Sequence, residues 1–150
     1  MKPQLFLKTS IVLAMLLIVV VAYADVKAPQ RTQGLIAPAP QGTHELVSLK
    51  GRGKFVSAEI TKQGGSNDLT FVSLDIDGKN VVNISIAALK NIGLTQNNPY
   101  GLVLLQPTGD PKTFTIGFSC PLVFKSELKL SVNVQEGGVV QILANVIHGK

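Results

Sequence analysis

Hydrophobic and polar residues alternate with a period of two along most of the chain after position 44. In LTFVSLDI (69–76), Thr70, Val72, Leu74 and Ile76 fall on one face, and ELKLSVNV (127–134) repeats this pattern. Val56, Ala58 and Ile60 alternate in the same way with polar neighbours. Successive side chains of a strand point to opposite sides of a sheet, so this period indicates strands with one buried face.

The predicted strands are separated by segments rich in Gly, Pro, Asn and Asp. They cover 44–50, 56–61, 69–76, 81–86, 101–106, 113–120, 127–134 and 139–147. A short helix is predicted over 85–93, with Ser85 as its N-cap and Gly93 as its stop. About eight short strands with one helix predict an all-β fold, an antiparallel β-sandwich of the jelly-roll or the immunoglobulin-like type.

The octapeptide SLDIDGKN (73–80) fits two structures. Asp75 and Asp77 resemble the start of a calcium loop, but Lys79, Asn80 and Val81 supply few of the oxygen ligands that such a loop needs. Asp77-Gly78 lies between two apolar runs, and Asp-Gly is typical of a type I′ turn, in which both central residues have positive φ. The sequence therefore predicts a β-hairpin and no metal site here.

The strand predicted over 113–120 carries the only cysteine of the chain. Phe114, Ile116, Phe118 and Cys120 are in phase, so we expect all of them to face the core opposite Leu128, Leu130 and Val132. A buried thiol of this kind is inert. A single cysteine also cannot form a disulfide within the chain, so stability must come from the core.

The first residues have the composition of a secretory signal. Lys2 and Lys8 precede the apolar run 11–22, and Ala22-Tyr23-Ala24 fits a cleavage site. That run is shorter than the roughly 20 residues that span a bilayer, although an uncleaved anchor is the alternative. We therefore expect residues 1–24 to be a signal peptide, with export to the periplasm or the cell exterior and no membrane span after cleavage.

Two further parts follow the predicted signal. Residues 25–43 contain three prolines and lack a hydrophobic period, so they are expected to be a Pro/Gln-rich flexible tail or linker. The alternative is an arm that docks on a neighbouring subunit through Leu35 and Ile36. Residues 44–150 form the expected sandwich domain, which is long enough for a core.

Charge argues against a nucleic-acid partner. The whole chain has a formal net charge of +5. Without Lys2 and Lys8 this falls to about +3, which favours solubility and weak attraction to anionic surfaces more than a dedicated nucleic-acid site.

The segments GKFVSAEIT, LTFVSLDIDGKNVV and FSCPLVFKSELKLSV resemble small jelly-roll or immunoglobulin-like modules of bacterial secreted proteins and of phage tail and fibre proteins. In those modules an I-D-G-K/T hairpin precedes a P-x-x-F-K-x-S/E-L-x-V segment. The resemblance covers roughly residues 51–135 and implies binding or assembly. It brings no catalytic residues and no cofactor.

Few residues carry candidate chemistry. No Gly-x-Ser-x-Gly elbow, P-loop or dinucleotide-binding glycine pattern is present. His44, Glu45 and His148 could meet at neighbouring edge strands, but a zinc site needs further geometry that the sequence does not give. Lys50, Arg52 and Lys54 form either a cationic ridge for an anionic glycan or headgroup, or a solvated hairpin tip. Asn97, Asn98 and Tyr100 are the polar and aromatic candidates that could complete a concave binding site with this ridge.

Two functions remain open from the sequence. The favoured one is a secreted, non-catalytic β-sandwich that binds an envelope protein or glycan, or assembles with copies of itself as a homo-oligomer. The alternative is a carbohydrate-binding module or a small polysaccharide hydrolase. Sugar sites usually present aromatic platforms, and the chain has two tyrosines, six phenylalanines and no tryptophan.

Overall fold

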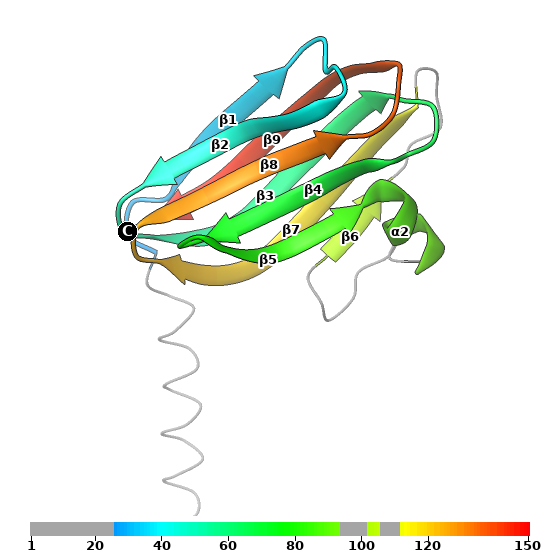
Figure 1. Ribbon diagram of the computed structural model, residues 1–150. Coiled ribbons are helices and arrows are strands. Elements are labelled where there is room, and N and C mark those ends of the chain that lie inside the picture. The colour runs from blue at the N-terminus through cyan, green and yellow to red at the C-terminus, as the bar shows by residue number, and fades with distance from the viewer. Residues whose placement is uncertain (1–25, 94–101, 106–111) are drawn as a thin grey trace, which may run out of the picture.

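A computed structural model describes residues 26–93, 102–105 and 112–150 (Figure 1). Two antiparallel sheets lie face to face, and the strand orders are β1-β9-β3-β7-β6 and β2-β8-β4-β5. The elements are β1 (Gln30–Ile36), β2 (Gly42–Lys50), β3 (Gly53–Gly64), β4 (Thr70–Ile76), β5 (Lys79–Ser85), α2 (Ile86–Asn91), β6 (Leu102–Leu105), β7 (Thr113–Phe124), β8 (Glu127–Val134) and β9 (Val139–Gly149). The predicted all-β sandwich is confirmed.

The strand pairs are nested along the chain. Strand β1 pairs with β9, β2 with β8, β3 with β7 and β4 with β5. The chain is thus a long antiparallel hairpin rolled into two sheets, which is the jelly-roll arrangement. Of the two topologies that the sequence left open, the structure has the jelly roll, with β6 as an added edge strand.

The core lies between the two sheets. Phe114, Ile116 and Phe118 of β7 are buried, as are Leu128, Leu130 and Val132 of β8. Because β7 and β8 belong to different sheets, the two rows close the interior from opposite sides. The predicted packing of these rows is confirmed for the six residues.

Cys120 is the exception, because its side chain is exposed. The register between β3 and β7 shifts where Phe55 pairs with Leu122 and Ser57 pairs with Ser119, so β7 carries an extra residue at a bulge. Pro121 has no N–H for a ladder hydrogen bond, which favours a bulge at this point. The prediction of a buried Cys120 is therefore wrong.

The same irregularity changes the phase of β3. Strand β3 also shifts against β9 between Phe55 and Ser57. Phe55 is consequently buried and Val56 is only half-buried, whereas Ala58 and Ile60 face the core as predicted.

The segment 25–43 is not a flexible tail over its whole length. Strand β1 pairs with β9 along its full length, with Leu35 opposite Leu143 and Ile36 opposite Ile142. A side chain at Gly34 would collide with the carbonyl group of Leu46, so β1 passes very close to β2. The predicted tail is therefore wrong for residues 30–36 and 42–43, which belong to β1 and β2, and β1 docks on its own chain. The predicted signal, 1–24, lies outside the described residues.

The local signals at Asp77-Gly78 and Ser85 are confirmed. Asp77 and Gly78 have φ of 51° and 76° in the turn between β4 and β5. The carboxylate of Asp77 also accepts hydrogen bonds from the backbone N–H groups of Lys125, Ser126 and Glu127. The Ser85 hydroxyl accepts a hydrogen bond from the N–H of Ala88 and caps α2.

Candidate functional site

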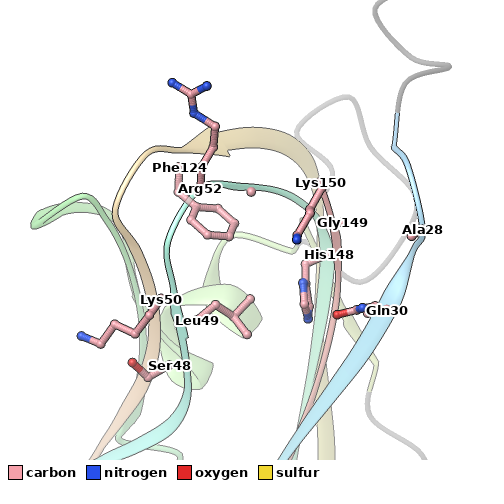
Figure 2. Close-up of a pocket in the computed structure, with 11 residues that line it drawn as sticks. Ala28, Gln30, Ser48, Leu49, Lys50, Arg52, Phe124, His148, Gly149 and Lys150 are labelled. Atoms are coloured by element: carbon pink, nitrogen blue, oxygen red, sulfur yellow. The ribbon is translucent and has the colours of Figure 1, made fainter.

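A hollow of about 360 Å³ opens at one end of the sandwich (Figure 2). It lies where the ends of β1, β2, β7 and β9 meet the turn that joins β2 to β3. Its lining includes Gln30, Leu49, Phe124, His148 and Lys150. The backbones of Lys27 and Lys150 exchange hydrogen bonds of 3.0 and 3.1 Å beside it, which ties the N-terminal segment to the last strand.

The hollow contains part of the predicted cationic ridge. Lys50 and Arg52 line it, and Lys54 lies on β3 outside the lining. In Figure 2 the guanidinium group of Arg52 extends away from the other lining side chains. Asn97, Asn98 and Tyr100 lie outside the described residues. Ligand binding by the ridge therefore stays a prediction.

The charge of Lys50 is neutralised by its neighbours. Its ammonium group forms an ion pair with Glu127, which also accepts a hydrogen bond of 3.2 Å from Ser48. The hydrogen bond from Lys50 is the main reason that the pKa of Glu127 lies below its usual value, and Lys129 contributes as well. The hollow is consequently a weaker anion site than a free ridge would be.

The two histidines do not meet. His148 Nε2 lies 2.9 Å from the Thr32 hydroxyl, and His44 Nε2 lies 2.8 Å from the carbonyl oxygen of Pro40. Burial lowers the pKa of His148, so its ring is neutral at physiological pH. Across the described ranges no group of three or more His, Cys, Asp or Glu side chains is arranged to hold a metal ion.

A different surface stands out on the outer side of the five-stranded sheet. The cross-strand rows of β1, β9, β3 and β7 are Arg31–Ile147–Ser57–Ser119, Gln33–Asn145–Glu59–Gly117 and Leu35–Leu143–Thr61–Thr115. We call these rows the β1–β7 face. Its charged side chains are Arg31 and Glu59, and no ion pair of either is present among the described residues. Leu35 is 61% exposed on it.

The outer side of the four-stranded sheet differs. Lys129 lies 3.5 Å from Glu45 and 3.8 Å from Glu127, and Lys50 pairs with the same Glu127. Such interspersed charges are typical of a solvated surface, whereas charges are depleted at the centre of protein interfaces. The β1–β7 face is therefore the better candidate for a contact surface.

The structure also contains a buried ionic cluster that the sequence did not indicate. Lys62, Asp68, Thr70 and Glu136 are all buried between the ends of the two sheets. Lys90 of α2 joins them through an ion pair of 2.9 Å with Asp68. The side-chain polar atoms buried in the described part of the chain all have hydrogen-bond partners, so the cluster has no unpaired group to offer a substrate. Its contacts connect β3, the loop before β4, the turn after β8 and α2.

None of the helices within the described ranges is long and apolar enough to cross a membrane.

Comparison with known proteins gives a likeness of fold. No protein-family model and no curated protein matches the sequence. The structure is similar to a chain of the acidic stable capsid of Helicobacter pylori bacteriophage KHP30, with a TM-score of 0.50 and 12% identity over 84% of this chain and 90% of that one. A chain of infectious bursal disease virus, Gt strain, has a TM-score of 0.38 and 13% identity, over 81% of this chain and 32% of that one.

Proposed function

We propose that this protein is a non-catalytic structural module that assembles with copies of itself through the β1–β7 face. The observation that carries the proposal is the composition of that face. Its rows combine Leu35, Leu143 and Ile147 with small hydroxyl side chains and very little charge. The solvent-exposed face of a sheet normally carries charged residues of both signs.

The two charges on the face suit a symmetric contact. Arg31 lies on β1 and Glu59 on β3, so they lie on either side of β9, the second strand of this sheet. A two-fold axis parallel to β9 would place Arg31 of one copy over β3 of the other, near Glu59, and the reverse pair would form at the same time. Self-complementary surfaces of this type are what a two-fold interface requires.

The size of the face sets the strength expected for one contact. With the axis along β9, three strands of each copy overlap, and three strands spaced about 4.8 Å apart, over about seven residues at 3.3 Å each, span roughly 330 Å². A standard interface buries about 800 Å² on each partner. A single pair of faces should therefore associate weakly, and a stable assembly would need several contacts at once.

Likeness of fold supports an assembly role. The phage protein of similar fold comes from a capsid. Because the two chains share 12% identity, the likeness assigns no partner or interface of the phage protein to this chain. The contact surface is therefore inferred from the residues of this chain alone. We further propose that the protein acts outside the cytoplasm after removal of residues 1–24, because an apolar run and an Ala-x-Ala site precede the domain.

The test is the oligomeric state as a function of concentration. Sedimentation velocity of residues 25–150 should show reversible association that strengthens between about 10 µM and 1 mM, as weak contacts of this size do. Arg31→Glu and Glu59→Arg should each weaken association, because like charges then face each other. The double variant should restore it, since the pair is re-formed with reversed sign.

Lys79→Glu is the matched control, because it reverses an exposed charge at the β4–β5 turn, away from the face. It should leave association unchanged. A protein that stays monomeric over the whole range would overturn the proposed function. Association that persists in both single variants would instead place the contact on another surface.

A further inference from the structure

A second hollow, of about 360 Å³, lies on the outer side of the four-stranded sheet. Its floor is formed where Ser73 of β4 pairs with Ser131 of β8 and with Asn83 of β5. The next row towards one end of the sheet contains Phe71 opposite Asn133. Small hydroxyl side chains between larger neighbours thus produce the depression.

Phe71 gives this hollow an apolar wall. Its neighbours Thr70 and Val72 face the core, so the alternation of β4 turns Phe71 outwards, where it is half-buried. The ring of Phe71 is therefore not part of the sandwich interior, in contrast to Phe114 and Phe118. A phenyl ring on the outer side of a sheet exposes apolar surface to water, which is unfavourable unless another group covers the ring.

Polar side chains that have no partner among the described residues line the hollow together with this ring. Across residues 26–93, 102–105 and 112–150, no hydrogen bond is present for the side chains of Ser131, Asn83 or Asn133. Ser131 is 8% exposed and lines the hollow, and its hydroxyl has no hydrogen-bond partner in the described part of the chain, so it can bond a molecule that enters the hollow. By contrast, the Asn80 amide orients the border by donating to Ser73 and Asp75 at 2.7 and 2.8 Å.

The chemistry of the lining selects the class of ligand. Asp75 is the charged residue of the lining, and no cation lies there to attract an anion. The backbone groups of β4 and β8 are already paired on both sides, so an extended peptide cannot add as a strand at this position. Amide and hydroxyl groups around an aromatic face match a neutral sugar, whose C–H face stacks on a ring while its hydroxyls form hydrogen bonds.

We propose that this hollow binds a neutral saccharide, with Phe71 as the stacking platform and Asn83, Asn133 and Ser131 as hydrogen-bonding groups. The site is on the sheet opposite the β1–β7 face, so it is independent of the proposed self-assembly. It would allow an assembled module to present sugar-binding sites outwards, where several weak sites act together.

The test is a titration of the ¹⁵N-labelled protein, residues 25–150, with maltohexaose, cellohexaose and chitohexaose, followed by NMR. At least one of these should shift the amide signals of residues 71–75 and 131–133 in a saturable manner. Asn83→Ala and Asn133→Ala should each weaken binding by about threefold to tenfold, the usual effect of one lost hydrogen bond. Phe71→Ala should weaken it by about tenfold or more.

Val81→Ala is the matched control, because Val81 is exposed on the same strand as Asn83 but does not line the hollow. Ser131→Val is a second test variant, because its larger side chain fills the floor of the hollow without removing the ring of Phe71. It should block binding while the protein stays folded. Absence of shifts with all three hexasaccharides overturns the proposal, as do shifts that map elsewhere. Shifts at the hollow that appear with protein concentration alone would also overturn it, because a second copy would then be the occupant.

Discussion

The ammonium group of Lys62 lies 2.6 Å from a carboxylate oxygen of Glu136, and both side chains are almost completely buried. The same carboxylate accepts hydrogen bonds from the Thr70 hydroxyl and from the N–H groups of Asn67 and Asp68. Lys62 also lies 3.5 Å from Asp68. The pair therefore connects β3, the loop before β4 and the turn after β8, and each charge has the partners that burial demands.

Loss of one member of this pair should be costly. Glu136→Ala and Lys62→Met should each lower the free energy of unfolding by about 3–5 kcal/mol, because the remaining charge is left buried without its partner. Urea denaturation measures this. Lys50→Met, which breaks the exposed pair with Glu127, should cost less than about 1 kcal/mol. Equal effects at the two sites would contradict the assigned burial.

Stability should fall in acid, and Glu136 should be a main cause. Burial raises the pKa of Glu136, but the hydrogen bonds from Lys62, Thr70 and Asn67 outweigh it, so the pKa lies below its usual value. The pKa of Asp68 is lowered against burial by Lys90 and Lys62 in the same way. A carboxyl group with a lowered native pKa stabilises the fold above its unfolded pKa, about 4.3 for Glu, and this is lost as the pH falls through the native value.

Urea denaturation between pH 7 and pH 3 measures this dependence. The curve of Glu136→Gln should be flatter below about pH 4.5, because the variant has no carboxyl group to protonate there. Glu45→Gln on the surface is the control and should keep the wild-type slope. If the free energy of unfolding of the variant fell with pH as steeply as that of the wild type, Glu136 would not be a cause of the loss of stability in acid.

Gly78 should resist replacement, because its φ is 76°. Gly78→Val should destabilise the protein by about 1–3 kcal/mol, since a β-branched residue is strained in the left-handed region. Gly137→Val is the control, because that glycine has no φ in the left-handed range and an added Cβ would meet no other atom within 4 Å. Calcium should not raise the melting temperature. A calcium-dependent rise would restore the metal interpretation of SLDIDGKN.

Replacement of Gly34 tests whether β1 is an integral strand of the sheet. Gly34→Ala should destabilise the protein by about 1–3 kcal/mol, because the added methyl group meets the backbone of Leu46 and forces the strands apart. Gly117→Ala, at a position with free space around it, should change stability by less than about 0.5 kcal/mol. A neutral Gly34→Ala would mean that β1 can leave the sheet without loss.

Cys120 should react in the native state. Its side chain is exposed at the bulge of β7, so a thiol reagent such as Ellman's reagent should label the folded protein without denaturant. Cys120→Ser should change the free energy of unfolding by less than about 0.5 kcal/mol, as surface substitutions do. If labelling required unfolding, Cys120 would be buried in the core, which would contradict this prediction.

Several features of this protein follow from local sequence. The alternation of Phe114, Ile116 and Phe118 gives a strand and its buried face, because the period of side chains in a strand is fixed at two. Asp77-Gly78 gives the hairpin because the turn itself demands positive φ. Ser85 gives the start of α2, since an N-cap acts on the N–H groups that follow it within one turn.

Other features depend on strands that are distant in the chain. The polar sequence of β1 has no hydrophobic signal, and it becomes a strand because β9, more than a hundred residues later, offers it a free edge. The exposure of Cys120 depends on where β3 and β7 fall out of register; Pro121 favours a bulge there, but the shift is defined only when the two strands pair. Lys62 lies in phase with Ala58 and Ile60, and its burial is possible only because Glu136 arrives from the turn after β8. Local patterns determine which segments are strands, whereas pairing across the fold decides which polar groups meet, because hydrogen bonds and ion pairs need a partner that only the tertiary structure brings.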